Sequence, residues 1–153
     1  MAANTSPIYT LTPNIGTVGI PTATAQIKSD GTSAGVSTDF VYKVFTSGSA
    51  GSYVDRVRFQ SVASAAAVTG VATTLRVYLS TIASPGATSN TDTWLLGEVS
   101  VPAVASSNSI NATNYYDIIL NMAIPTGRYI HVSQHVAQTT NQRWNAICFG
   151  GDY

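Results

Sequence analysis

Short runs rich in β-branched and aromatic residues recur along the chain, and clusters of glycine, proline, serine and asparagine separate them. This spacing is typical of an all-β sandwich or barrel. The best helical candidate, residues 63–68, is too short and too close to Gly70 to predict a helix. The segments that predict strands are 23–28, 39–46, 53–62, 71–82, 94–101, 115–123, 128–136 and 143–149.

Hydrophobic and polar residues alternate along several of these runs, as expected for strands with one buried and one solvated face. In residues 53–62, valine and phenylalanine face one way while arginine and glutamine face the other. Residues 71–82 repeat the pattern, with Arg76 and Tyr78 predicted to face solvent. Eight or nine such strands predict an antiparallel β-sandwich of the jelly-roll type.

The first 25 residues differ from the rest and predict an extended N-terminal arm, followed by a single β-sandwich domain over residues 26–153. Three prolines interrupt the arm, and proline cannot donate a hydrogen bond to a β-ladder. Two interpretations stay open at this point: the arm reaches onto a neighbouring subunit, or it forms an edge strand on its own domain. The apolar residues that would attach it to a partner are Ile8, Tyr9, Leu11, Ile15, Val18 and Ile20.

The charge content of the chain is low, and this bears on what its surface contacts. Charged residues make up 9% of the 153 residues, and seven basic residues balance seven acidic ones. Ordinary soluble domains contain about 25% charged residues, and a net charge near zero favours self-association. We therefore expect a subunit of an assembly, with a low-charge monomer as the alternative.

The same composition argues against two classes of partner. No basic patch is present to neutralise phosphates, so we expect no nucleic acid. No apolar run approaches the roughly 18 residues that predict a membrane-spanning helix, so we expect no membrane. Residues 1–6 lack both the basic and the apolar part of a secretory signal, which predicts synthesis in the cytoplasm.

Candidate chemistry is sparse. His131 and His135 are four residues apart, but the run that contains them predicts a strand and not the helix that a zinc motif requires. No spacing singles out two acids as a catalytic pair, and the single cysteine, Cys148, lies in an apolar run where it predicts a small buried side chain. We expect no catalytic residue, no metal and no cofactor, and hence a protein that is not an enzyme.

Aromatic side chains are the remaining candidates for recognition, because they bind sugars and anchor interfaces. Trp144 alternates with small apolar residues, which favours a place in the core. Trp94 follows a polar loop, and Tyr115 and Tyr116 begin another predicted strand. These three, with Tyr153 at the end of the last strand, predict a subunit contact or a glycan-binding platform.

Residues 144–153 read Trp-Asn-Ala-Ile-Cys-Phe-Gly-Gly-Asp-Tyr. This segment resembles the ending of small virion proteins that are often encoded in tailed-phage genomes. Further resemblance lies in residues 54–59 (Val-Asp-Arg-Val-Arg-Phe), 75–79 (Leu-Arg-Val-Tyr-Leu), 96–99 (Leu-Gly-Glu-Val) and 125–129 (Pro-Thr-Gly-Arg-Tyr). The resemblance spans roughly residues 27–153.

What the resemblance implies is a capsid decoration protein, a homotrimeric β-sandwich on the outer surface of a phage capsid. Its partners would be the major capsid protein and further copies of itself, and the N-terminal arm would attach it by strand addition to a neighbouring sheet. The alternative is a receptor- or glycan-binding module of a head or tail fibre, which would use the exposed aromatic residues.

Overall fold

A computed structural model describes residues 10–21, 28–29, 41–66, 68–83, 91–109 and 115–153. These residues form ten β-strands and, within the described ranges, no helix. The strands are β1 (Thr12–Ile20), β2 (Tyr42–Thr46), β3 (Ser52–Ala63), β4 (Val68–Thr69), β5 (Thr73–Ser80), β6 (Thr93–Val101), β7 (Ala105–Ser106), β8 (Tyr115–Ile124), β9 (Tyr129–Gln134) and β10 (Gln142–Asp152).

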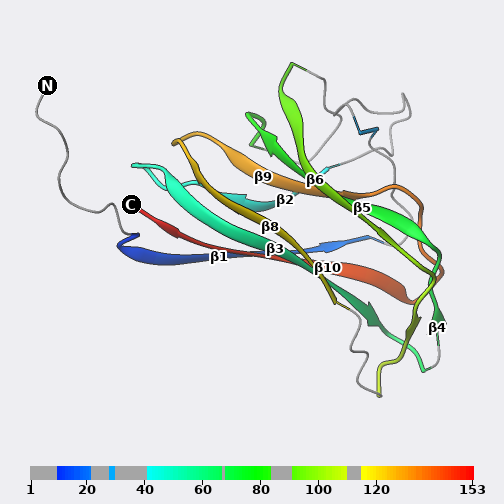
Figure 1. The fold of residues 1–153 in the computed structure, drawn as a ribbon. Helices are drawn as coiled ribbons and strands as arrows, with labels where there is room; N and C mark the ends of the chain where they lie inside the picture. The colour runs from blue at the N-terminus through cyan, green and yellow to red at the C-terminus, as the bar shows by residue number, and fades with distance from the viewer. Residues whose placement is uncertain (1–9, 22–27, 30–40, 67, 84–90, 110–114) are drawn as a thin grey trace, which may run out of the picture.

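The predicted antiparallel sandwich is confirmed. One four-stranded sheet has the order β1–β10–β3–β8 and faces a second with the order β2–β9–β5–β6 (Figure 1). The pairing is nested, because β1 pairs with β10, β2 with β9, β3 with β8 and β5 with β6. A long hairpin rolled up so that its strand pairs alternate between two sheets gives this pattern, which is the jelly roll.

Strand β10 lies between β1 and β3 and contributes three side chains to the core. Trp144, Ala146 and Cys148 are all fully buried, as the alternation predicts. Burial raises the pKa of the Cys148 thiol to about 12, so this cysteine is a small hydrophobic side chain at neutral pH. The core residues that pack around them come from both sheets and include Ile20, Val44, Phe45, Val54, Val57, Phe59, Leu75, Val77, Ile118, Ile124, Ile130 and Val132.

Most of the predicted arm that the structure describes is a strand of the sandwich. Residues 12–20 pair with β10 over their whole length, from Thr12 opposite Asp152 to Ile20 opposite Trp144. Ile20 belongs to the hydrophobic core. Of the two interpretations of this segment, an edge strand on its own domain is therefore the one that applies to residues 12–20.

Strand β1 also packs closely against β2 of the other sheet. A Cβ atom on Gly16 would lie 1.7 Å from the carbonyl oxygen of Val44, so only glycine allows the two backbones to approach this far. Gly19 lies on the opposite side of the same strand, where the nearest atom to a Cβ would be 3.4 Å away. The position of β1 thus depends on a side chain being absent at Gly16.

On the outer side of the second sheet, the structure contradicts the prediction that two residues of β5 face solvent. Arg76 and Tyr78 are predicted to face solvent, but their exposed fractions are 8% and 0%. The Tyr78 hydroxyl donates a hydrogen bond to the carbonyl of Lys28 at 3.3 Å, and Val41 packs on the same side chain. Lys28 and Val41, which precede β2, therefore cover Tyr78, and alternation within β5 cannot reveal such a cover.

A small two-stranded sheet, β4 with β7, was not predicted because each strand has only two residues. It closes one end of the sandwich, where the Ser106 hydroxyl hydrogen-bonds to that of Ser61. The Gln142 side chain also donates to Ser61, at 2.9 Å. Polar side chains thus replace hydrophobic packing at this end of the core.

The packing of β1 predicts that two glycine-to-alanine substitutions on this strand change the free energy of unfolding by different amounts. Gly16→Ala forces a Cβ into the Val44 carbonyl and should lower the free energy of unfolding by about 1–3 kcal/mol, the usual cost of overpacking. Gly19→Ala should change it by less than about 0.5 kcal/mol. Urea unfolding followed by tryptophan fluorescence measures both. Equal effects of the two variants would show that residues 12–20 do not pack against β2.

Candidate functional site

The strand register brings a row of apolar side chains and one arginine together on the outer side of the β1–β10–β3–β8 sheet. Ile15 on β1 lies opposite Phe149 on β10, and Phe149 lies opposite Arg56 on β3. Arg56 in turn lies opposite Ile119 on β8. The Arg56 guanidinium lies over the Phe149 ring, 4.5 Å from its centroid, so the cation packs onto the apolar surface.

The next row along the strands carries an ion pair. Arg58 donates two hydrogen bonds to Asp117 on β8, at 2.8 and 2.7 Å. These bonds lower the pKa of the Asp117 carboxyl, so the aspartate remains charged at neutral pH. The Arg58 guanidinium also lies 4.2 Å from the centroid of the Tyr115 ring. Ile147 lies opposite Arg58 and extends the apolar strip along β10.

We call this set of side chains the outer face. It comprises Ile15, Tyr115, Asp117, Ile119, Ile147, Phe149, Arg56 and Arg58. Arginine and aromatic residues are enriched in protein–protein interfaces, whereas unpaired charges are depleted from interface centres. Both arginines of the outer face are held by carboxylates, Arg56 by Asp55 and Arg58 by Asp117. The face is therefore suited chemically to contact another protein.

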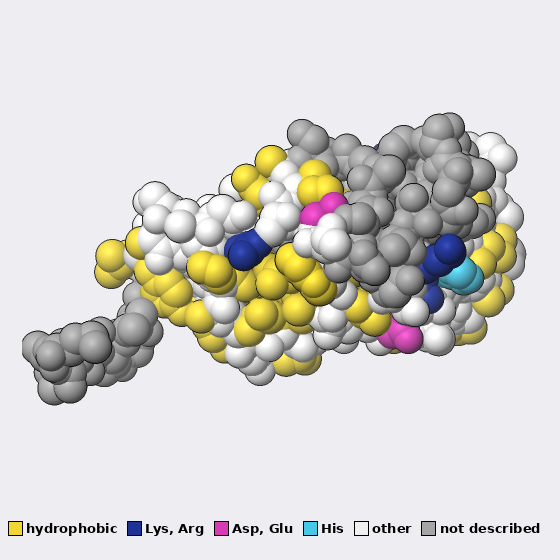
Figure 2. Space-filling model, turned by 90° about the horizontal axis from the view of Figure 1, so that it is seen from above, with side chains coloured by type: hydrophobic (Ala, Val, Ile, Leu, Met, Phe, Trp, Pro, Cys, Tyr) yellow, Lys and Arg dark blue, Asp and Glu magenta, His cyan; other side chains and the backbone are white. Residues whose placement is uncertain are grey.

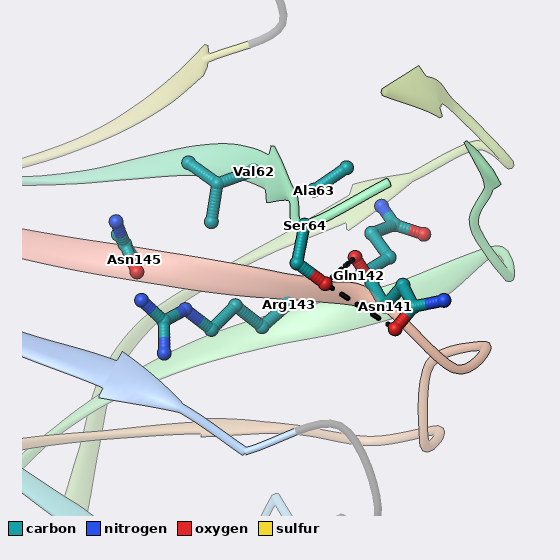
Figure 3. Close-up of a pocket in the computed structure, with 7 residues that line it drawn as sticks. All are labelled: Val62, Ala63, Ser64, Asn141, Gln142, Arg143 and Asn145. Carbon is teal, nitrogen blue, oxygen red and sulfur yellow. Dashed lines mark hydrogen bonds between the residues drawn. The ribbon is translucent and has the colours of Figure 1, made fainter. Parts of the chain in front are cut away.

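A shallow groove borders the outer face at the β10 end nearest Gln142 (Figure 3). Its volume is about 590 Å³, and it is lined by residues from the end of β3 and the start of β10. The side chains of Arg143 and Asn145 lie next to each other in it. A second depression of about 450 Å³ shares these two residues and continues to Gly19 on β1. No ion pair among the described residues involves Arg143, so the groove has one cation available to a ligand or partner.

Hydrogen bonds anchor the C-terminal residues at the opposite end of β10. The Asp152 carboxylate accepts hydrogen bonds from the Asn14 side chain on β1 at 2.9 Å and from the Ser52 hydroxyl on β3 at 2.5 Å. These bonds lower the pKa of Asp152. A Cβ on Gly150 would lie 2.5 Å from the Tyr53 carbonyl oxygen, so glycine is required there for close backbone approach. The Gly-Gly-Asp ending thus joins three strands.

The predicted attachment residues of the arm differ in their exposure to solvent. Leu11 and Ile15 are exposed, by 83% and 60%, and are available for contact. Ile20 is fully buried and not available for a partner, whereas Val18 is partly buried and packs against the core. Ile8 and Tyr9 lie outside the described residues.

The structure does not bring the predicted aromatic residues together. Trp94 is opposite Leu79 near the start of β6, whereas Tyr115 is opposite Gln60 near the start of β8. Gly97 contacts Ile118, and β6 and β8 run in opposite directions, so Trp94 and Tyr115 lie toward opposite ends of the sandwich.

The two remaining aromatic candidates have different surroundings. Tyr116 packs edge-on against the buried Trp144, with the ring centroids 5.9 Å apart, so it serves the core. Tyr153 lines a depression with Ile124 and Pro125, and its backbone amide donates to the Gly51 carbonyl at 3.2 Å. The C-terminal tyrosine is therefore held against the end of β8.

The two histidines do not form a pair. His131 is fully buried on β9, and this burial lowers its pKa to about 4, whereas His135 is exposed beyond the end of that strand. No cluster of three or more metal-ligating side chains occurs among the described residues. Within the same residues, no helix is long and apolar enough to cross a membrane.

On the side of the β2–β9–β5–β6 sheet, Figure 2 shows few charged side chains among the coloured hydrophobic and uncharged polar ones. Half-exposed Trp94 and Leu95 belong to strand β6 at the edge of this sheet. The low charge content of the sequence is thus visible on the molecular surface.

Sequence reasoning missed four residues of this region: Ile119, Ile147, Phe149 and Arg143. Alternation along each strand places all four on the outward side, which is a usable signal. Their position beside Ile15 and Arg56 depends on the register between distant strands, however, and that register cannot be read from one strand alone.

Comparisons with models of protein families, with curated proteins and with solved structures gave no match to this chain.

The Asp152 anchor predicts a pH-dependent effect. The pKa of Asp152 is lower in the folded than in the unfolded chain, so its contribution to stability is present above the unfolded value of about 3.9 and is lost as the pH falls through the folded value. At pH 7, Asp152→Asn should lower the free energy of unfolding by about 1 kcal/mol, because a neutral acceptor makes weaker bonds and the site is only partly buried. Unfolding curves between pH 7 and 2 should show the two proteins converging. A difference that is independent of pH would contradict the anchor.

Proposed function

We propose that this chain is a structural protein of a phage virion, and specifically a capsid decoration protein that binds the capsid lattice and stabilises it. The C-terminal resemblance supports the virion assignment. The fold is compatible with it, since jelly rolls occur in viral capsid and lectin domains. Because one fold serves many functions, the assignment has to rest on a surface and not on the fold.

The observation that carries the proposal is the outer face. A four-stranded sheet exposes isoleucine side chains on both of its edge strands, Ile15 on β1 and Ile119 on β8, each more than half exposed. Between them lie a phenylalanine and arginines whose charges are already paired. Such a surface is typical of a protein that acts while bound to other proteins.

The mechanism follows from this composition. A decoration protein adds buried interface to a shell that is under internal pressure, and it can do so without charged contacts. Leu11, immediately before β1, has a side chain that is 83% exposed, while its backbone amide donates to the Asp152 carbonyl at 2.7 Å. We assign attachment to the major capsid protein to residues 1–11 and not to the strand that follows, because residues 12–20 already pair with β10.

The alternative, a glycan- or receptor-binding fibre module, has less support. It requires exposed aromatic side chains in one cluster, and Trp94 and Tyr115 lie toward opposite ends of the sandwich. The proposal therefore keeps the capsid as the site of action.

The proposal predicts where the protein is found. Particles purified from cells that express the gene together with its genomic neighbours should contain the chain in many copies, and cryo-electron microscopy should show its density at every equivalent position of the capsid lattice. Density at a tail or fibre tip would instead support the alternative. Purified particles that contain no copy of the chain, although it is expressed together with them, would contradict any virion role.

Attachment through the N-terminal residues has its own test. A variant that lacks residues 1–9 keeps all of β1, so its thermal unfolding should match that of the full chain. It should nevertheless bind at least tenfold less to particles purified without the protein, as measured by co-sedimentation. Equal binding of the two forms would show that attachment uses another surface.

A further inference from the structure

We infer that the outer face seats a second copy of this chain, and that two copies pack through it sheet to sheet. This inference rests on the proposed function for its biological setting, and it gives a two-fold contact between two copies in place of the homotrimer that the resemblance implies. Its evidence, however, is the arrangement of side chains on the β1–β10–β3–β8 sheet, and its test needs no capsid.

The size of the face is sufficient for a stable contact. Its four strands, spaced by about 4.8 Å and about ten residues long at 3.3 Å per residue, cover roughly 600 Å². Stable interfaces begin at about 600 Å² per partner.

The charges of the face are self-complementary. Arg56, Arg58 and Asp117 of the face, with Asp55 beside them, give two positive and two negative groups, and each arginine is already paired within the same copy. Two such faces can approach without a net repulsion and without stripping water from an unpaired charge. Within this set of four groups a basic or acidic partner would find no net charge to recognise, which favours a copy of the same chain; Arg143, which forms no ion pair with a described residue, lies outside the set, at the start of β10.

The order of the strands gives the matching arrangement. If a second copy is rotated by 180° about an axis parallel to the strands, its β8 lies over β1 and its β3 lies over β10. Ile119 of one copy then meets Ile15 of the other, and Arg56 meets Phe149. Apolar side chains contact each other at both edges, while the centre repeats the arginine–aromatic contact that each copy already contains. The symmetry of this contact is that of the common two-fold dimer.

Two variants on opposite edges of the face test the inference. Ile119→Asp and Ile15→Asp each place a charge where the apolar side chains would meet. Both isoleucines are mostly exposed, so thermal unfolding should stay close to that of the wild type. Analytical ultracentrifugation of the purified full-length chain should show self-association for the wild type. Each variant should weaken it by about 30-fold or more, the effect expected at a hot-spot position.

Leu95→Asp is the matched control, because Leu95 is also an exposed aliphatic residue but lies on β6 of the opposite sheet. It should leave the association unchanged. A wild-type chain that is monomeric at all concentrations, or an oligomer that both Ile variants leave intact, would overturn the inference.

Binding of the same variants to particles separates the two proposals. A variant that no longer associates in solution but still binds particles supports the inference and the proposed function independently. Association lost as expected, by a chain that never binds particles, contradicts only the proposed function.

Discussion

The insertion of β10 between β1 and β3 is the constraint on which the rest of this structure depends. These three strands come from the beginning, the middle and the end of the chain, so the sheet is complete only when the last residues are in place. The inward side chains of β10 fill the core around Trp144, and its outward side chains form the centre of the outer face. Core, register and candidate interface are therefore set by one strand.

The C-terminal ending gains a physical explanation from this position. Gly150 permits the backbone of β10 to approach that of β3, and Asp152 binds side chains from β1 and β3. These contacts fix the register at one end of the sheet. Because a shift by one residue would move the outward isoleucines into the core, the ending also determines which side chains the outer face displays.

Much of the fold could be predicted from the sequence, because alternation is a local property. It identified the strands that contain Val57, Val77 and Trp144 and placed Trp144 in the core. It failed for Tyr78, which Lys28 and Val41 cover, and for Arg76, which pairs with Glu98 on β6. It also left the role of residues 12–20 open, because pairing with β10 joins segments that are far apart in sequence. The candidate site could be predicted only in part for the same reason. Alternation predicts that each of its residues points outward, but the register between distant strands decides which of them lie side by side.

Self-association would cover the outer face with another copy of the chain in solution. Hydroxyl-radical footprinting at increasing protein concentration tests it most directly, because the modification of each side chain reports its exposure. We expect falling modification of Ile15, Ile119 and Phe149 as the concentration rises, with Trp94 and Leu95 on the opposite sheet unchanged. Modification of the three outer-face residues that stays constant with concentration would contradict it.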